Sequence, residues 1–269
     1  MDKTCLKEKE MPYPRVCAHR GFHVVSPENS LPAYEEAIAL GAQEIEFDLW
    51  QSSDGVIVSC HDADLERIST GKGLVIEHTY EELYSYDFGI KKDEAFKGLH
   101  IASFEDILRL FGKKAVMNIH IKSLDSFTPL DDAVLLKIIE LIKKYGCEEY
   151  VYFMCGNPYV LDALQRLAPD IPRCAGADSR NGRPVYDIVD KALKYGCAKI
   201  QIFKPHFKFY PADYLEKTVK RAHENGIMVN IFYSDREDEA AQFIKAGCDT
   251  VLTNDYRRIA NHLKKEGLL

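Results

Sequence analysis

The sequence has no apolar run that approaches the roughly 20 residues a membrane-spanning helix requires. Its first residues, MDKTCLKEKEMPYPRV, also contain no apolar core of a secretory signal. These absences argue against an integral membrane segment and favour a cytoplasmic protein. An exported form whose signal has already been removed stays open.

No CxxC pair occurs among the cysteines, and most of them sit inside apolar runs. This usage favours buried free thiols over a disulfide framework or a zinc site. Cys17 and Cys60 are nearest to the polar motifs described below, and we expect them to be small core side chains. The eight cysteines are Cys5, Cys17, Cys60, Cys147, Cys155, Cys174, Cys197 and Cys248.

The chain has no linker-like tract and no excess of positive charge. Without a Pro/Gly/Ser-rich or low-complexity segment, its 269 residues are predicted to form one domain, residues 1–269. The net charge of -7 argues against nucleic acid or an anionic membrane surface as a partner. An anionic small molecule would need positive charge supplied locally.

Short apolar strands alternate with amphipathic helices along most of the sequence. Glycines 146, 196 and 247 each follow a predicted helix and precede a predicted strand, at spacings of two strand-helix units, and suit left-handed helix ends. This order predicts an α/β fold, a (β/α)8 TIM barrel of eight parallel strands, with residues 63–100 as an irregular insertion. The predicted strands are 15–18, 44–50, 115–121, 150–154, 173–177, 199–203, 228–233 and 250–252.

Two carboxylates occupy one face of the second predicted strand. Residues 44–50 alternate as a strand, so Glu46 and Asp48 point to the same side. Adjacent carboxylates repel each other unless a cation or a proton intervenes, which makes a divalent metal ion a natural ligand. An exposed strand with solvated acids is the alternative.

A hairpin follows this strand. Asp54-Gly55 is typical of a two-residue turn, and residues 56–60 supply the returning strand. With that turn, Asp48 stands opposite His61, so the hairpin itself would bring a carboxylate and an imidazole together.

The polar motifs resemble those of the glycerophosphodiester phosphodiesterase family. The matching elements are His19-Arg20, Glu46-Phe47-Asp48 and the His61-Asp62 pair that follows an Asp-Gly turn. Residues 27–31, 65–67, 70–73, 103–108, 118–122 and 251–255 continue the similarity over nearly the whole chain.

The resemblance implies a catalytic site with one divalent metal ion, magnesium or calcium in the family, held by Glu46 and Asp48. The family pattern Asn-x-Glu-x-Lys reads Asn118-Ile119-His120-Ile121-Lys122 here, so His120 takes the place of a glutamate. An imidazole still ligates metals, but it favours manganese or zinc. The alternative is that His120 only fills the barrel mouth.

The same resemblance implies roles for the remaining site residues. Arg20 and Lys122 would bind the substrate phosphate, while His19 and His61 would divide general base and general acid catalysis. The nucleophile is either water or the neighbouring glycerol hydroxyl.

Several residues near these motifs carry weaker expectations. Phe232 and Tyr233 either cover the glycerol moiety or pack inside the barrel. We expect Trp50 to pack beneath the hairpin, His23 to be a solvated loop residue and Lys204 to be a surface lysine. The insertion, residues 63–100, would border the site and set specificity.

The function implied is metal-dependent hydrolysis of a small-molecule glycerophosphodiester to glycerol 3-phosphate and an alcohol. One alternative is a phospholipase D-like hydrolase of lysophospholipids, which needs an apolar groove beside His61; the aromatic segment 80–104 could form it. The other is a non-catalytic barrel that binds phosphodiesters.

Overall fold

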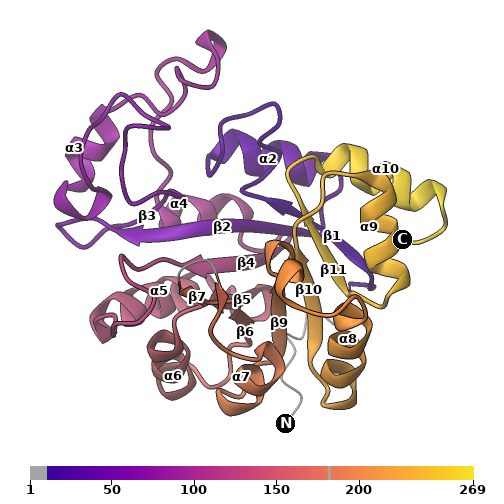
Figure 1. Ribbon diagram of the computed structural model, residues 1–269. Coiled ribbons are helices and arrows are strands. Elements are labelled where there is room, and N and C mark those ends of the chain that lie inside the picture. Colours follow the sequence, from indigo (N-terminus) through magenta and orange to yellow (C-terminus); the bar gives the residue numbers. More distant parts are fainter. Residues whose placement is uncertain (1–10, 181–182) are drawn as a thin grey trace.

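The computed structural model describes residues 11–180 and 183–269, so Cys5 and the polar start of the chain lie outside the described residues. Eight parallel strands form a closed barrel, because β1 pairs with both β2 and β11. This confirms the predicted TIM barrel (Figure 1). The strands are β1 (Arg15–His19), β2 (Glu44–Gln51), β4 (Val116–Ile121), β5 (Val151–Cys155), β6 (Arg173–Gly176), β9 (Lys199–Phe203), β10 (Met228–Phe232) and β11 (Thr250–Thr253).

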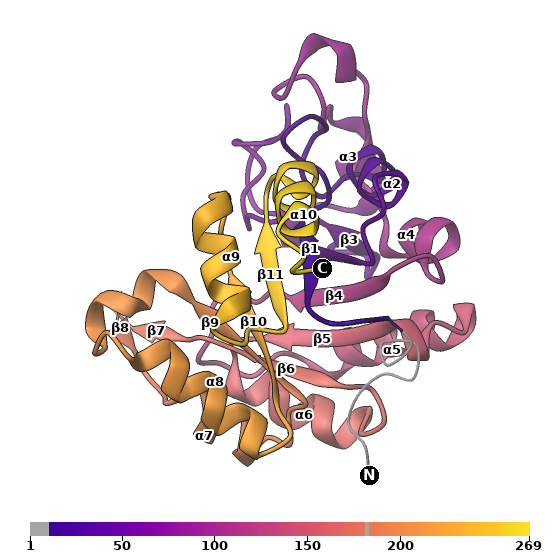
Figure 2. The ribbon, with the colours of Figure 1, turned by 90° about the vertical axis from the view of Figure 1, so that its right-hand side faces the viewer.

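Helices follow the strands and pack on the outside of the barrel (Figures 1 and 2). Alternate strand residues such as Ile45, Phe47 and Leu49 point outward into this apolar layer. No helix in the described ranges is long and apolar enough to cross a membrane. The helices are α2 (Leu31–Ala39), α4 (Phe104–Phe111), α5 (Asp132–Tyr145), α6 (Pro158–Leu167), α7 (Ile188–Lys194), α8 (Tyr214–Glu224), α9 (Glu237–Lys245) and α10 (Tyr256–Lys265).

Polar side chains cap the starts of several of these helices, and glycines follow the ends of three of them, as the sequence predicts. The Ser30 hydroxyl accepts from the backbone N–H of Ala33 at the start of α2. Gly146, Gly196 and Gly247 have φ values of 59°, 59° and 95°. Each thus adopts the left-handed conformation predicted for a glycine between a helix and the next strand.

The interior of the barrel is polar at the amino-terminal ends of the strands. Glu44 is fully buried, with Arg15 Nη1 at 3.5 Å from its Oε2 and the Tyr152 hydroxyl donating to its Oε1 at 2.6 Å. The Asn230 amide donates to the same hydroxyl at 2.9 Å. We call Arg15, Glu44, Tyr152 and Asn230 the barrel-floor network.

The hairpin after β2 forms, but its predicted register is wrong by one residue. Strand β3 (Ile57–Ser59) places Gln51 opposite Ile57 and Leu49 opposite Ser59. The turn holds three residues, 53–55, since the Ser52 N–H donates to Val56 O, and Gly55 takes a φ of 86°. Asp48 therefore stands beside Cys60, not opposite His61.

The insertion is irregular, as predicted, and projects from the barrel beside α2 (Figure 1). It contains η1 (Val75–Glu77), α3 (Tyr80–Ser85) and η2 (Glu94–Phe96). A separate apolar cluster holds it together, in which Trp50 packs under the hairpin against residues such as Leu65 and Phe88.

Four short elements were not predicted: η3 (Glu148–Tyr150), η4 (Lys204–Phe209), and the paired strands β7 (Ser179–Arg180) and β8 (Arg183–Pro184). The sequence pattern predicts a helix over residues 185–195, but α7 begins only at Ile188, because the Asp187 carboxylate caps it there by accepting from two backbone N–H groups. Such short elements carry too few residues to show a periodic pattern.

Candidate active site

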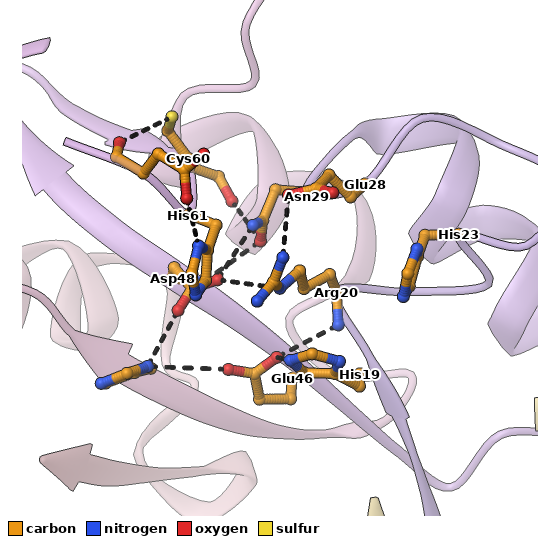
Figure 3. Close-up of polar contacts among 12 residues, drawn as sticks. His19, Arg20, His23, Glu28, Asn29, Glu46, Asp48, Cys60 and His61 are labelled. Atoms are coloured by element: carbon orange, nitrogen blue, oxygen red, sulfur yellow. Dashed lines mark hydrogen bonds and ion pairs between the residues drawn. The ribbon is translucent and has the colours of Figure 1, made fainter. Parts of the chain in front are cut away.

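A pocket of about 330 Å³ opens at the carboxyl-terminal ends of the barrel strands, where active sites of this fold lie. Figure 3 shows His19, Glu46, Asp48 and His61 grouped there. Of the predicted site residues, those lining the pocket are His19, Glu46, Asp48, His61, His120, Lys122 and Phe232; Arg20 and Tyr233 are not among its lining residues.

The two carboxylates of β2 lie side by side and are buried, as the strand alternation predicts. Burial and the neighbouring Asp48 raise the pKa of Glu46 to about 8. Burial alone would also raise the pKa of Asp48, but Lys122 and His120 outweigh it and hold that pKa well below its ordinary value. Without a cation, the pair therefore retains a proton on Glu46 near neutral pH.

The surroundings of Asp48 are rich in donors. Its Oδ1 lies 2.8 Å from His120 Nδ1 and 3.4 Å from Lys122 Nζ, and its Oδ2 accepts from the Asn29 amide at 2.9 Å. Because β2 and β4 run parallel with Asp48 beside His120, the register itself makes the first of these contacts.

The cluster of Glu46, Asp48 and His120 fits a metal ion. One ligand atom from each lies within 4.8 Å of the others, and the buried Asp48 Oδ1 accepts no well-aligned hydrogen bond from the described residues. Burial and Lys122 lower the pKa of His120 to about 4, so the ring is neutral and keeps a nitrogen lone pair for a metal. The donor set of oxygens and one nitrogen suits a divalent cation.

His19 ends β1 and borders the pocket. Its Nδ1 lies 2.7 Å from Asn254 Oδ1 and its Nε2 lies 3.8 Å from Glu46 Oε2. Burial, together with Arg20, lowers the pKa of His19 to about 3. A neutral imidazole in this position can accept a proton.

His61 follows the hairpin and is paired with its neighbour. Its Nδ1 lies 2.6 Å from Asp62 Oδ1, and Asp62 is held in turn by Arg67. Burial lowers the pKa of His61 despite the nearby Asp48 carboxylate. A carboxylate partner thus orients this imidazole, whereas an amide orients His19.

Arg20 is not among the residues that line the pocket, and its main chain and side chain contact three acids beside it. Its backbone, at φ 55°, turns so that its N–H donates to Glu46 Oε2 at 3.1 Å. The guanidinium pairs with Glu28 at 3.0 Å and lies 3.7 Å from Asp48 Oδ2. Its positive charge therefore acts on the site by partly neutralising these acids, of which Asp48 lines the pocket.

Two further residues lie near the site without lining the pocket. The prediction that His23 is a solvated loop residue is wrong: it is half-buried, and its Nε2 lies 2.7 Å from Asn254 Oδ1. Lys204 pairs with Glu239 at 2.8 Å.

The aromatic pair at the end of β10 splits between two positions. Phe232 lines the pocket, with its ring edge-on to His19 at 4.8 Å. Tyr233 follows through a cis peptide bond and stacks 6.2 Å from His19 without lining the pocket. The aromatic side chains of residues 80–104 do not reach it either.

Several residues that hold the site together were given no role from the sequence. Each lies at a strand end or in one of the quoted motif segments, and that position is the sequence signal that could have identified it. These residues are Glu28, Asn29, Arg67, Asp235 and Asn254.

Comparisons with known proteins identify the family of this chain. The family model described as "Glycerophosphoryl diester phosphodiesterase family" matches residues 19–258. A glycerophosphodiester phosphodiesterase of Caldanaerobacter subterraneus subsp. tengcongensis is 32% identical over 94% of this chain and 98% of its own. A second one, from Bacillus subtilis, is 24% identical over 92% of this chain and 85% of its own.

Solved structures share the fold. A phosphodiesterase of Oleispira antarctica, in complex with the product sn-glycerol-3-phosphate, superposes with a TM-score of 0.81 at 22% identity and covers 94% of this chain and 97% of its own. An Agrobacterium tumefaciens glycerophosphodiester phosphodiesterase gives 0.76 at 20% identity, over 92% and 99%. With the family model spanning most of the barrel and the site motifs in place, this chain belongs to the glycerophosphoryl diester phosphodiesterase family.

Proposed function

We propose that this protein is a metal-dependent phosphodiesterase that hydrolyses glycerophosphodiesters to glycerol 3-phosphate and an alcohol. The observation that carries the proposal is the meeting of two imidazoles, His19 and His61, with the Glu46, Asp48 and His120 cluster in one pocket. Family membership and the names of its relatives support the substrate class.

Glu46, Asp48 and His120 would hold one divalent ion, which when bound neutralises phosphoryl charge as the transition state forms. Lys122 lines the pocket beside Asp48 and would bind a phosphate oxygen. Arg20 would add its charge from behind Asp48.

The hydrogen-bond partners of His19 and His61 differ, and we use them to assign one proton transfer to each imidazole. We assign His19, whose Nδ1 faces the Asn254 amide oxygen and whose Nε2 lies 3.8 Å from Glu46, as the general base that takes a proton from the nucleophile. His61 has the Asp62 carboxylate at Nδ1, which stabilises an imidazolium, so it is the general acid that protonates the leaving alcohol. The negative charge of a bound phosphodiester counteracts the burial that lowers the pKa of His61.

The test is release of glycerol 3-phosphate from glycerophosphocholine by metal-stripped protein resupplied separately with magnesium, calcium, manganese and zinc. We expect turnover with at least one ion, and a loss of about 10²-fold or more in kcat for His19→Ala and for His61→Ala. His223→Ala, an exposed histidine on α8, is the matched control. Phosphorus NMR during turnover would detect a cyclic phosphate if the glycerol hydroxyl is the nucleophile.

No turnover with any ion would overturn the proposal. Hydrolysis of lysophospholipids in place of glycerophosphocholine would move the assignment to a lipid substrate. Tight product binding without turnover would indicate a binding protein.

A further inference from the structure

One asparagine just after the last barrel strand contacts two histidines. Oδ1 of Asn254 lies 2.7 Å from Nδ1 of His19 and 2.7 Å from Nε2 of His23. On its other side, Nδ2 of Asn254 lies 2.6 Å from Oδ2 of Asp235. A continuous path of contacts therefore leads from a carboxylate, through an amide, to an imidazole at the pocket.

The carboxylate fixes which way the amide points. Oδ1 of Asp235 accepts from the backbone N–H of Asn254 at 2.7 Å and from the Thr253 hydroxyl at 2.9 Å. An ionised carboxylate only accepts hydrogen bonds, so the NH₂ group of Asn254 must face its Oδ2. The opposite orientation would place two oxygens 2.6 Å apart with no proton between them.

The amide in turn fixes the protons on the imidazoles. The carbonyl oxygen of Asn254 has two lone pairs and no proton, so both histidine nitrogens that face it must be donors. A neutral His19 then carries its proton on Nδ1 and a lone pair on Nε2, the nitrogen that lies 3.8 Å from Glu46. His23 occupies the second lone pair, which completes the hydrogen bonding of this oxygen.

We infer that Asp235 and Asn254 are positioning residues that select the Nδ1–H tautomer of His19 and so leave Nε2 free to act as a base. The catalytic consequence rests on the proposed function. The tautomer itself is a property of the folded protein whether or not it turns over substrate.

Asp235→Asn tests the inference because it changes no shape. The new side chain must keep its oxygen toward the backbone N–H of Asn254, which leaves its NH₂ group facing the Asn254 side chain. Asn254 must then turn over and present its own NH₂ group to His19. We expect His19 to change to the Nε2–H tautomer and kcat to fall about 10- to 100-fold, with KM changed less than about twofold.

The tautomer is measured by long-range ¹⁵N–¹H NMR on histidine-labelled, metal-free protein at neutral pH. His19→Gln assigns the signal, and wild-type protein is expected to show Nδ1–H. Asp238→Asn is the matched control, because it removes the same charge from the exposed start of α9 without touching Asn254. This control should keep the wild-type tautomer and kcat.

Retention of Nδ1–H in Asp235→Asn with kcat near wild type would overturn the inference, as would an Nε2–H tautomer in the wild-type protein. If Asp235→Asn fails to fold, Asn254→Ala replaces it: a mixture of His19 tautomers supports the inference, and unchanged Nδ1–H overturns it. A tautomer change in a protein without phosphodiesterase activity would reject the proposed function and uphold the positioning role.

Discussion

Glu46 and Asp48 differ in pKa although they are two residues apart on one strand. Asp48 has Lys122, His120 and Asn29 around it, so its negative charge is compensated from several sides. Glu46 receives one backbone N–H, from Arg20, and faces its charged neighbour. In the metal-free protein, a proton on Glu46 thus neutralises negative charge that a bound metal ion would otherwise neutralise.

This arrangement predicts that the metal-free protein loses stability as the pH rises from 7 to 8. The pKa of Glu46 is about 8 when folded against 4.5 as the ordinary value, so the folded state holds the extra proton and its contribution is lost as the pH passes through 8. The unfolded histidines are already mostly neutral above pH 7. The expected loss is about 1 kcal/mol, relative to Glu46→Gln, in urea unfolding at each pH.

Saturating manganese should remove this pH dependence, because a cation replaces the proton. An equal decline in Glu46→Gln would show that another group is responsible.

His120 is predicted to set the metal preference. Replacing an imidazole by a carboxylate hardens the ligand set, so His120→Glu should shift binding toward magnesium and calcium relative to manganese and zinc. We expect a change of about tenfold or more in the ratio of dissociation constants, measured by calorimetry. His120→Gln is the control, and an unchanged ratio in His120→Glu would mean that position 120 does not ligate the metal.

At the scale of residues, strand alternation is enough to predict that Glu46 and Asp48 share a face, whereas the family resemblance was needed to predict that His120 and Lys122 lie near them. It could not predict the link between His19 and Asn254, which are 235 positions apart. That contact depends on barrel closure, which no local pattern encodes.

Among the elements, the hairpin between β2 and β3 shows how one turn residue sets a register. Gly55 at φ 86° ends a three-residue loop, and a methyl group added at its Cα would have only Gln51 Nε2 near it, at 3.9 Å. A side chain there would meet no obstacle, so the cost of substitution comes from the backbone alone.

Gly55→Ala should therefore destabilise the protein by about 1 kcal/mol, because a left-handed backbone is unfavourable for alanine. Gly55→Asn should cost less, since asparagine tolerates this conformation. Urea unfolding measures both, and equal losses for the two variants would contradict the backbone explanation. Activity should persist in each, since the strand pairing that precedes His61 is retained.

The register of this hairpin was predicted wrongly because an Asp-Gly pair is compatible with two hairpin loops of different length. It forms a two-residue turn when both residues have positive φ, and a three-residue loop when only the glycine does. In this protein the Ser52 hydroxyl accepts from the Val56 N–H, and the longer loop is stabilised. By contrast, the helix ends at Gly146, Gly196 and Gly247 were predictable, since a left-handed glycine cap is local.

At the scale of the whole molecule, the barrel has polar groups at both ends. Those at the amino-terminal ends of the strands are enclosed, and those at the carboxyl-terminal ends line the pocket. In the barrel-floor network, Arg15 forms an ion pair with the buried Glu44 and the Tyr152 hydroxyl donates to it, so the chain itself supplies the positive charge beside that acid. At the carboxyl-terminal end of β2, Glu46 and Asp48 lie on the same strand face as Glu44, but they line the open pocket. The same residue type is thus structural at one end of β2 and available for chemistry at the other.

Tyr152→Phe tests the floor. Removing the hydroxyl leaves one oxygen of Glu44 and the Asn230 amide without this partner in a buried place, at an expected cost of about 1–3 kcal/mol. Urea unfolding measures the loss, with the half-exposed Tyr159→Phe as control. Equal stability of the two variants would show that the floor hydrogen bonds contribute little.

The order of strands and helices predicts the barrel because each strand-helix unit repeats the same pattern, and the insertion stands out as the stretch where the pattern fails. Its internal arrangement was not predictable, since it depends on an apolar cluster that joins Trp50 of β2 to insertion residues such as Leu65, which no periodic pattern indicates.

Closure of the barrel joins the first strand to the last, with β11 beside β1 in both views (Figure 2). A chain emerging from the ribosome exposes His19 early but must wait for residues 250–254 before Asn254 can fix its proton. At about 5–20 residues per second, that delay is roughly 10 to 50 seconds. Full phosphodiesterase activity would therefore appear only after β11 has been made, and a nascent chain halted before β11 would carry Glu46, Asp48 and both histidines without the asparagine that fixes the proton of His19.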